Sequence, residues 1–132
     1  MPDPLIAAAA IARARAHAPF SKFRVGAALE AEGGTIVMGS NVESASYGLT
    51  MCAERTAIFK GVSEGHTRFV KVAVVTDTDT PTPPCGACRQ LLWEFAPDAV
   101  VLLANLKGDV IRYTMRELLP AAFDAGQLDR HS

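Results

Sequence analysis

The chain of 132 residues has the length of a single domain, which we expect to span residues 1–132, and at this size folding buries enough surface for a hydrophobic core. Hydrophobic residues make up 49% of the chain and charged residues 20%, a composition that excludes intrinsic disorder. Thirteen Lys and Arg against fourteen Asp and Glu give a net charge of -1, so the chain lacks the positive charge that holds phosphates, and we expect no nucleic-acid partner.

The first half of the chain predicts two helices separated by a β-hairpin. Pro19 ends the first helix, and a Glu-Gly-Gly turn between two apolar segments is typical of a hairpin. Apolar residues at helical spacing predict the second helix, which Gly65 follows as a C-cap glycine. In chain order we expect a helix over 4–17, strands over 25–31 and 35–40, a polar loop over 41–50 and a helix over 51–64.

The second half of the chain alternates strands and helices. A loop dense in Thr, Asp and Pro separates a strand from a helix, and a later run of aliphatic residues suits a strand that is buried on both faces. Thr114 and Glu117 have the spacing of a capping box for a short last helix. In chain order we expect a strand over 70–75, the loop over 76–84, a helix over 85–96, strands over 99–104 and 110–113, and a helix that Pro120 limits.

This order of elements predicts the α/β class. Because helices that alternate with strands cover both faces of a sheet, we expect a three-layer α/β/α sandwich with a mixed five-stranded sheet. Crossover helices join parallel strands, so we expect the strands after the hairpin to be parallel.

Hydropathy and cysteine content bear on the partners and the location of the protein. The mean hydropathy of +0.17 is high for a small protein and predicts a homo-oligomer in which subunits cover part of the surface. The apolar stretch over 5–12 is too short to span a membrane, and Asp3 before it is unlike a secretory signal, so we expect no membrane partner. Three cysteines cannot close a disulfide framework, which favours a reducing compartment and a cytoplasmic location.

All three cysteines fall at the starts of predicted helices. Cys52 begins one helix, and Cys85 and Cys88 stand at the start of the next. The free N–H groups of a helix N-terminus favour thiolate, the form that binds zinc. The C-x-x-C spacing lets two sulfurs reach one ion, and Cys52 would be the third ligand. Three protein ligands leave one position of a Zn²⁺ ion open for water, which is typical of a catalytic site, here with one zinc ion per chain.

Glu54 lies two residues after Cys52, in the first turn of the same predicted helix. Its carboxylate can approach a metal-bound water without binding the metal, so we expect it to carry protons. A C-x-E followed by P-C-x-x-C is the signature of zinc deaminases, with Cys in place of the His of other members. The chain has Cys52-Ala53-Glu54 and Pro84-Cys85-Gly86-Ala87-Cys88.

Two other interpretations of the cysteines stay open. One is a redox dithiol at Cys85 and Cys88 with Cys52 merely buried. The other is a structural, non-enzymatic zinc site with a fourth ligand from His17, His66 or His131. Neither accounts for Glu54, Pro84 and both helix starts together.

Five motifs spread over nearly the whole chain match one known family. They are PFSKFRVGAAL at 19–29, NVE at 41–43, CAERTA at 52–57, PCGACRQ at 84–90 and LLP at 118–120. With them the chain resembles the small homotetrameric zinc-dependent cytidine deaminases. The resemblance implies a cytidine deaminase-like fold and the hydrolysis of a cyclic amidine C–N bond in pyrimidine salvage. Cytidine and 2′-deoxycytidine would become uridine and 2′-deoxyuridine plus ammonia, by attack of zinc-bound hydroxide with Glu54 as proton shuttle.

The polar loop after the hairpin holds the expected substrate contacts. Asn41 and Glu43 are two residues apart, so in extended chain both side chains point the same way and can reach one ligand. In the resembling family this pair binds the ribose. The backbone around Ala53 is expected to contact the edge of the base. The family motif usually continues with Asn where this chain has Ser44.

Three further residues take roles that the resemblance implies. Arg55 would hydrogen-bond a ligand sulfur and offset the thiolate charge, a role for which Arg89 could compete. Phe23 resembles the aromatic residue that packs against the pyrimidine, and Phe123 resembles one that reaches a neighbouring subunit's site. The chain has Ala121 where the family often has Gly.

Two alternative functions keep the same metal ligands. A deaminase of a modified nucleoside such as blasticidin S would retain the zinc ligands and Glu54 but alter the pocket. A deaminase that edits polynucleotides would need a basic stripe or additional aromatic platforms, which the sequence lacks.

Overall fold

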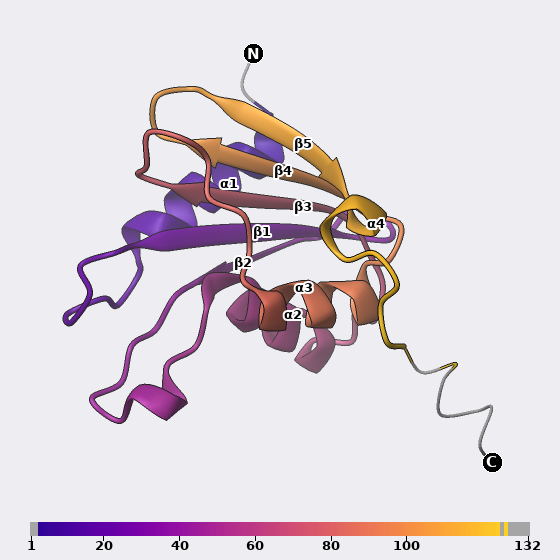
Figure 1. Ribbon diagram of the computed structural model, residues 1–132, viewed down its shortest axis with the longest axis horizontal. Coiled ribbons are helices and arrows are strands. Elements are labelled where there is room, and N and C mark those ends of the chain that lie inside the picture. Colours follow the sequence, from indigo (N-terminus) through magenta and orange to yellow (C-terminus); the bar gives the residue numbers. More distant parts are fainter. Residues whose placement is uncertain (1–2, 125, 127–132) are drawn as a thin grey trace.

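The computed structural model describes residues 3–124 and 126 of the chain. Its helices and strands follow the predicted order, with a short 3-10 helix, η1, inside the predicted polar loop (Figure 1). In chain order they are α1 (Pro4–Ala14), β1 (Val25–Ala31), β2 (Ile36–Ser40), η1 (Tyr47–Leu49), α2 (Ala53–Ser63), β3 (Phe69–Thr76), α3 (Gly86–Phe95), β4 (Val100–Asn105), β5 (Val110–Thr114) and α4 (Met115–Leu118).

Helix α1 begins at a capped N-terminus and ends earlier than predicted. The Asp3 side chain caps its first turn, and the helix ends at Ala14 instead of continuing to His17. His17 leaves the helix because its backbone pairs with the segment after β2. Its N–H donates to the Asn41 carbonyl at 3.0 Å, and its carbonyl accepts from the Glu43 N–H at 2.8 Å.

The strands form one mixed five-stranded sheet in the order β2-β1-β3-β4-β5. β1 pairs antiparallel with β2 and β3, and β3 pairs parallel with β4. The prediction of parallel later strands is right for β3 and β4 and wrong for β5, which pairs antiparallel with β4. Residues 106–109 join these two strands in a tight turn with Gly108 at φ 97°, whereas a parallel pair needs a crossover of roughly a dozen residues.

Helices cover both faces of the sheet, which confirms the predicted α/β/α sandwich. Helix α1 packs on one face over a small apolar cluster, and α2 and α3 share the other face over a larger one (Figure 1). β3 serves both layers, because Ala73 and Val75 belong to the cluster under α1 while Val72 and Val74 belong to the other. Consecutive buried residues in the central strands therefore reflect burial on two faces.

The packing of α2 on the sheet leaves room for no side chain at one strand position. A Cβ atom on Gly39 of β2 would lie 2.5 Å from the Ala57 nitrogen and 2.7 Å from the Ala53 oxygen of α2. Both atoms belong to the helix backbone, so they cannot move aside unless the helix moves. Gly39 therefore sets the distance between the sheet and α2.

The strand register brings separate chain segments together at one end of the strands, which we call the sheet edge below. Val25 at the start of β1 pairs with Thr76 at the end of β3. The first residues of α2 and α3 reach the same edge, since Cys52 and Cys85 line one cavity with Val25 and Thr76. This edge is where the predicted site residues meet.

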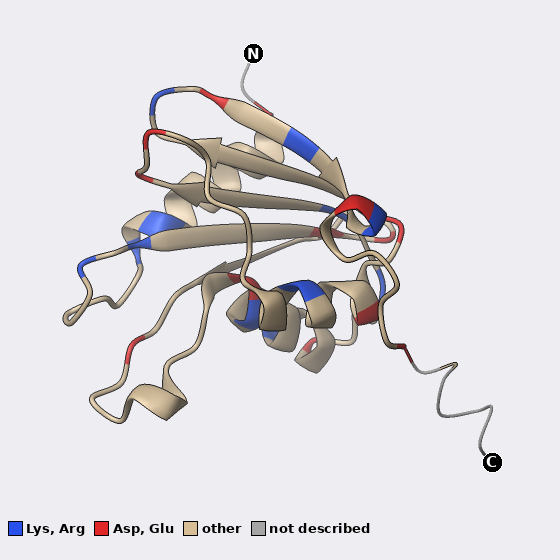
Figure 2. Ribbon diagram, viewed as in Figure 1, with Lys and Arg blue, Asp and Glu red and all other residues tan. Residues whose placement is uncertain are grey.

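The described surface is mixed in charge and partly apolar. Basic and acidic residues are dispersed along the ribbon in Figure 2, and no described element carries a continuous basic stripe. Large exposed apolar side chains include Ile11, Phe20, Phe59 and Leu106. None of the helices in the described part of the chain is long and apolar enough to cross a membrane.

Substituting Gly39 with Ala should destabilise the protein. The added methyl group overlaps the α2 backbone, so we expect a loss of about 3 kcal/mol in the free energy of unfolding, measured by denaturant titration. Gly48→Ala is the matched control, because a Cβ there would meet nothing within 4 Å. A Gly39→Ala protein as stable as the control would contradict this account of the packing.

Candidate active site

The three cysteines converge at the N-termini of α2 and α3. Cys52 and Cys85 are the N-cap residues of these helices, and Cys88 lies in the first turn of α3. Their sulfur atoms all lie within 4.8 Å of one another, and those of Cys85 and Cys88 are 3.5 Å apart. All three are free thiols.

The chemistry and spacing of these donors fit a zinc ion. Thiolate sulfurs bind zinc at about 2.3 Å, so two ligands of a tetrahedral ion lie about 3.8 Å apart, within the observed spacing. Within residues 3–124 and 126 these cysteines are the one group of side chains that could hold a metal, and neither His17 nor His66 belongs to it. His131 lies outside the described residues. A fourth protein ligand is therefore not found in the described part of the chain.

The surroundings of the thiols favour a bound cation. Burial, with the nearby Glu54 carboxylate, raises the pKa of Cys88. Burial acts in the same direction on Cys85, but hydrogen bonds from the Cys88 and Ala87 N–H groups and from neighbouring thiols lower the pKa of Cys85 overall. Because zinc binds thiolates, metal binding releases the thiol protons, and the cation offsets the negative charge that burial disfavours.

Arg55, and not Arg89, reaches the cluster. Its Nη2 atom donates to the Cys52 sulfur at 3.4 Å, a contact that raises the pKa of the Arg55 guanidinium. The Nε atom of Arg89 donates to the Pro84 carbonyl at 2.8 Å, and its Nη1 atom donates to the Leu118 carbonyl at 2.9 Å. These backbone contacts keep Arg89 away from the sulfurs.

Helix α2 buries Glu54 beside the thiols. Glu54 lies on the same helix face as Ala57 and Ile58, which packs on the sheet, and 5% of its surface is exposed. Burial raises the pKa of Glu54, although its own N–H, the Cys88 thiol and Arg55 act in the opposite direction. A carboxyl group with a raised pKa exchanges protons closer to neutral pH, as a proton carrier must.

A cavity of about 250 Å³ opens between the thiols and the sheet edge. It is smaller than most ligand pockets, which measure about 300–1,000 Å³, so it suits a small molecule or one part of it. Its walls are mostly apolar, with polar groups near the cysteines. The predicted site residues that line it are Phe23, Asn41, Cys52, Ala53, Glu54 and Cys85.

The two residues predicted to bind a sugar lie in adjoining cavities instead of one. Asn41 lines the first cavity, where its Oδ1 atom accepts from the Val25 N–H at 2.9 Å and its Nδ2 atom donates to the Phe23 carbonyl at 2.8 Å. Glu43 lines a second cavity of about 380 Å³, and Thr50 lines both. A ligand that contacts both Asn41 and Glu43 must therefore extend past Thr50.

Glu43 is held by the segment before β1. Its carboxylate accepts from the Phe20 N–H at 3.1 Å, the Ser21 N–H at 3.0 Å and the Ser21 hydroxyl. The Ser21 oxygen also accepts from the Phe23 N–H at 3.0 Å, so it joins Glu43 to Phe23. The hydrogen bond from the Ser21 hydroxyl is the main reason why the pKa of Glu43 is lowered.

The two phenylalanines predicted to serve a site differ in position. Phe23 lines the cavity, and 42% of its surface is exposed. Phe123 is 58% exposed and is not among the residues that line the cavity, and its carbonyl accepts from the Gln90 side chain at 2.7 Å. Ala121 has φ 53°, so the chain takes a left-handed turn before Phe123 despite the Cβ that glycine would lack.

Four polar residues of the site are not among the residues predicted from the sequence. Thr50, Thr76 and Thr82 line the cavity, and Ser21 holds Glu43. The place of Thr76 directly after an apolar strand was a usable signal, because strand ends often border binding sites. No sequence pattern indicates a contact such as that between Ser21 and Glu43, which are 22 residues apart.

Comparisons with known proteins agree with this geometry. A family model described as "Cytidine and deoxycytidylate deaminase zinc-binding region" matches residues 3–104. A cytidine deaminase from Halalkalibacterium halodurans is 53% identical over 95% of this chain and 96% of that protein. The crystal structure of cytidine deaminase from Burkholderia pseudomallei superposes with a TM-score of 0.87 at 49% identity, covering 90% of this chain and 96% of that one. A blasticidin-S deaminase from Bacillus cereus is 32% identical over 78% of this chain and 79% of that protein.

The fold, the geometry of the site and the similar proteins all point to one class of enzyme. An α/β/α sandwich with three thiols and a buried glutamate at two helix N-termini defines a zinc-dependent deaminase. The chain belongs to the cytidine deaminase family.

Substituting Ser21 with Ala should raise the pKa of Glu43, because the main hydrogen bond to its carboxylate is lost. The measurement is an NMR pH titration of the Glu43 carboxyl carbon. In the unaltered protein the lowered pKa adds stability above the ordinary pKa of a glutamate, and this stability is lost as the pH falls through the lowered value. The Ser21→Ala protein should show less of this acid-dependent loss.

Ser46→Ala is the matched control for this titration. Ser46 lies in the same loop as Glu43, and no described hydrogen bond joins its hydroxyl to Glu43. Equal Glu43 pKa values in the Ser21→Ala and Ser46→Ala proteins would show that the Ser21 hydroxyl does not control this carboxylate.

Proposed function

We propose that this protein deaminates cytidine and 2′-deoxycytidine by hydrolysis, releasing uridine or 2′-deoxyuridine and ammonia. The observation that carries the proposal is the buried Glu54 beside three convergent thiols in a small cavity. Membership of the cytidine deaminase family supports it, since relatives carry that name over almost their full length.

We assign Cys52, Cys85 and Cys88 as the ligands of one zinc ion per chain. When bound, the ion would supply a Lewis acid that lowers the pKa of a water molecule towards neutrality. Arg55 donates to the Cys52 sulfur and so draws negative charge away from the ligand set. With less negative charge on its ligands, the zinc ion would still be able to lower the pKa of water.

Glu54 moves the protons of the reaction. It removes one proton from the attacking water and delivers it to the ring nitrogen N3, then removes the second proton of the same water oxygen and delivers it to the leaving amino group. Water adds to C4 of the pyrimidine, the bond from C4 to the amino nitrogen breaks, and ammonia leaves. Burial supports this role because it raises the pKa of Glu54, so the side chain can both accept and release a proton.

The remaining cavity residues bind and orient the nucleoside. Asn41 and Glu43 take the ribose hydroxyl groups, since each keeps hydrogen-bonding capacity after its contacts to the backbone are counted. Phe23 packs against the base, and the backbone at Ala53 contacts its edge. Phe23, Ala53 and Asn41 line one cavity and Glu43 lines the adjoining one, so the base would lie in the first cavity and the ribose would extend into the second.

We further propose a homotetramer of chains that each form one catalytic domain over residues 1–132. Phe123 supports the assembly, because it is exposed and lies outside the cavity of its own chain, as a residue that reaches a neighbouring site would. Exposed apolar side chains such as Ile11 and Phe59 are consistent with covered faces. Three thiols that must stay reduced to hold a metal favour the cytoplasm.

The proposed activity should depend on zinc. Purified protein should deplete cytidine, followed by ultraviolet absorbance, and release an equal amount of ammonia. Treatment with a chelator should abolish both signals, and added zinc should restore them, because the ion would supply the Lewis acid that lowers the pKa of the attacking water. Turnover of blasticidin S without turnover of cytidine or 2′-deoxycytidine would instead favour the modified-nucleoside alternative.

Glu54→Gln should keep the zinc and lose the activity. The substitution removes the proton carrier and no metal ligand, so we expect one zinc per chain by atomic absorption and a fall in kcat of about 1,000-fold. Glu64→Gln, at the exposed C-terminal end of the same helix, is the control and should stay fully active. Normal turnover by the Glu54→Gln protein would refute the proposed proton transfer.

A further inference from the structure

The loop between β3 and α3, residues 77–85, forms one wall of the cavity. Thr82, Pro83 and Cys85 of this loop line the cavity, together with Thr76 at the end of β3. The loop therefore determines where one thiol of the cluster lies and which polar atoms face a ligand. The conformation of this loop depends on two sets of hydrogen bonds.

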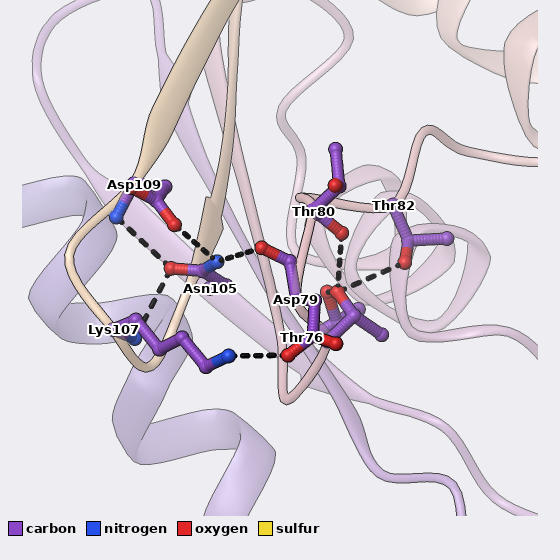
Figure 3. A network of polar contacts seen from close by, with 8 residues as sticks. Thr76, Asp79, Thr80, Thr82, Asn105, Lys107 and Asp109 are labelled. Atoms are coloured by element: carbon purple, nitrogen blue, oxygen red, sulfur yellow. Dashed lines mark hydrogen bonds and ion pairs between the residues drawn. The ribbon is translucent and has the colours of Figure 1, made fainter.

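Thr78 is the centre of the hydrogen bonds inside the loop. Its hydroxyl donates to the Thr80 carbonyl at 2.6 Å, lies 2.9 Å from the Thr76 hydroxyl and accepts from the Thr82 hydroxyl at 3.2 Å. Figure 3 shows Thr76, Thr80 and Thr82 gathered around these contacts. One side chain thus connects both threonines of the cavity wall.

The number of protons gives these hydrogen bonds a direction. A threonine hydroxyl has one proton and two lone pairs. The Thr78 proton goes to the Thr80 carbonyl, so Thr76 and Thr82 must each donate their own proton to Thr78. Both hydroxyls then retain lone pairs alone. Thr76 is 1% exposed, whereas Thr82 is partly exposed, so the Thr82 hydroxyl can accept a hydrogen bond from a ligand but cannot donate one.

A second network holds the same loop from outside. Asn105 is 5% exposed, and its Nδ2 atom donates to the Asp79 carbonyl at 3.1 Å and to the Asp109 carboxylate at 2.8 Å (Figure 3). Its Oδ1 atom accepts from the Lys107 and Asp109 N–H groups at 3.1 and 2.9 Å, and the Lys107 ammonium pairs with Asp79. These contacts do not involve Thr78, so they should keep the loop folded when Thr78 is replaced.

We infer that Thr78 is a positioning residue that makes the cavity select a pyrimidine with a ring amino group over one with a carbonyl in the same place. It turns the Thr82 hydroxyl into a hydrogen-bond acceptor on the cavity wall. An amino group can donate to this hydroxyl, whereas a carbonyl oxygen would face an acceptor and lose its hydrogen bonds to water. The inference rests on the proposed function. It adds that the product, which carries a carbonyl group in place of the amino group, binds more weakly than the substrate and therefore leaves.

Thr78→Val tests this inference, because it keeps the shape of the side chain and removes the hydroxyl. The dissociation constants of cytidine and uridine are measured by calorimetry on zinc-loaded protein that also carries Glu54→Gln, so that cytidine is not consumed. Without Thr78 as acceptor, the Thr82 hydroxyl can rotate and donate to a carbonyl. The ratio of the uridine Kd to the cytidine Kd should fall about fivefold, the effect of roughly one net hydrogen bond.

Three further variants make the result specific. Thr78→Ser keeps the hydroxyl and should retain the Kd ratio. Thr80→Val should retain it too, because Thr80 contributes its carbonyl to the network and no described hydrogen bond of its side chain. Thr82→Val removes the proposed acceptor directly and should lower the ratio, which also tests the inference if Thr78→Val fails to fold.

An unchanged Kd ratio in Thr78→Val or Thr82→Val would overturn the inference, as would an equal fall in Thr80→Val. A purely structural role for Thr78 would weaken both ligands alike and leave the ratio unchanged. Failure of the proposed function has a different signature, since the protein with Glu54 intact would then release no ammonia from cytidine.

Discussion

Two helices that begin at the same edge of the sheet are the constraint on which the site depends. The N-termini of α2 and α3 bring Cys52, Cys85 and Cys88 within 4.8 Å of one another, although the sequence separates the first from the second by a helix, a strand and a loop. Gly39 lets α2 approach the sheet closely, and the parallel pairing of β3 with β4 requires a crossover that contains α3. Without this arrangement Cys52 would lie apart from Cys85 and Cys88, at an unrelated helix N-terminus.

Burial disfavours the negatively charged forms of the side chains at this sheet edge, and a bound cation would stabilise those forms. Glu54 and Cys88 are both buried, and burial raises the pKa of each. Arg55 and the helix N-termini supply part of the compensating positive charge. A bound zinc ion would supply further positive charge, so the apolar surroundings that disfavour anions become a reason for the site to bind metal.

Local patterns explain why most elements and the metal ligands could be predicted. The helices and strands have regular apolar spacing, and a C-x-x-C pair with a distant C-x-E is a rare combination. The errors concern contacts between segments. α1 ends early because the backbone of His17 pairs with the loop after β2, and β5 is antiparallel because its connection is short. Ser21 lies inside the motif at 19–29, but neither Ser21 nor Thr78 is part of a pattern that indicates its hydrogen-bond partner.

The sequence by itself determined the class of chemistry, because the identity and spacing of the cysteines and Glu54 specify a zinc-binding helix start with an adjacent proton carrier. Only the tertiary structure decided which arginine meets the sulfurs, that Asn41 and Glu43 occupy adjoining cavities, and that Thr78 orients two hydroxyls of the cavity wall. The reason is physical. Ligand type and local spacing are properties of short segments, whereas burial, pKa and the direction of a hydrogen bond depend on side chains that folding brings together from distant parts of the chain.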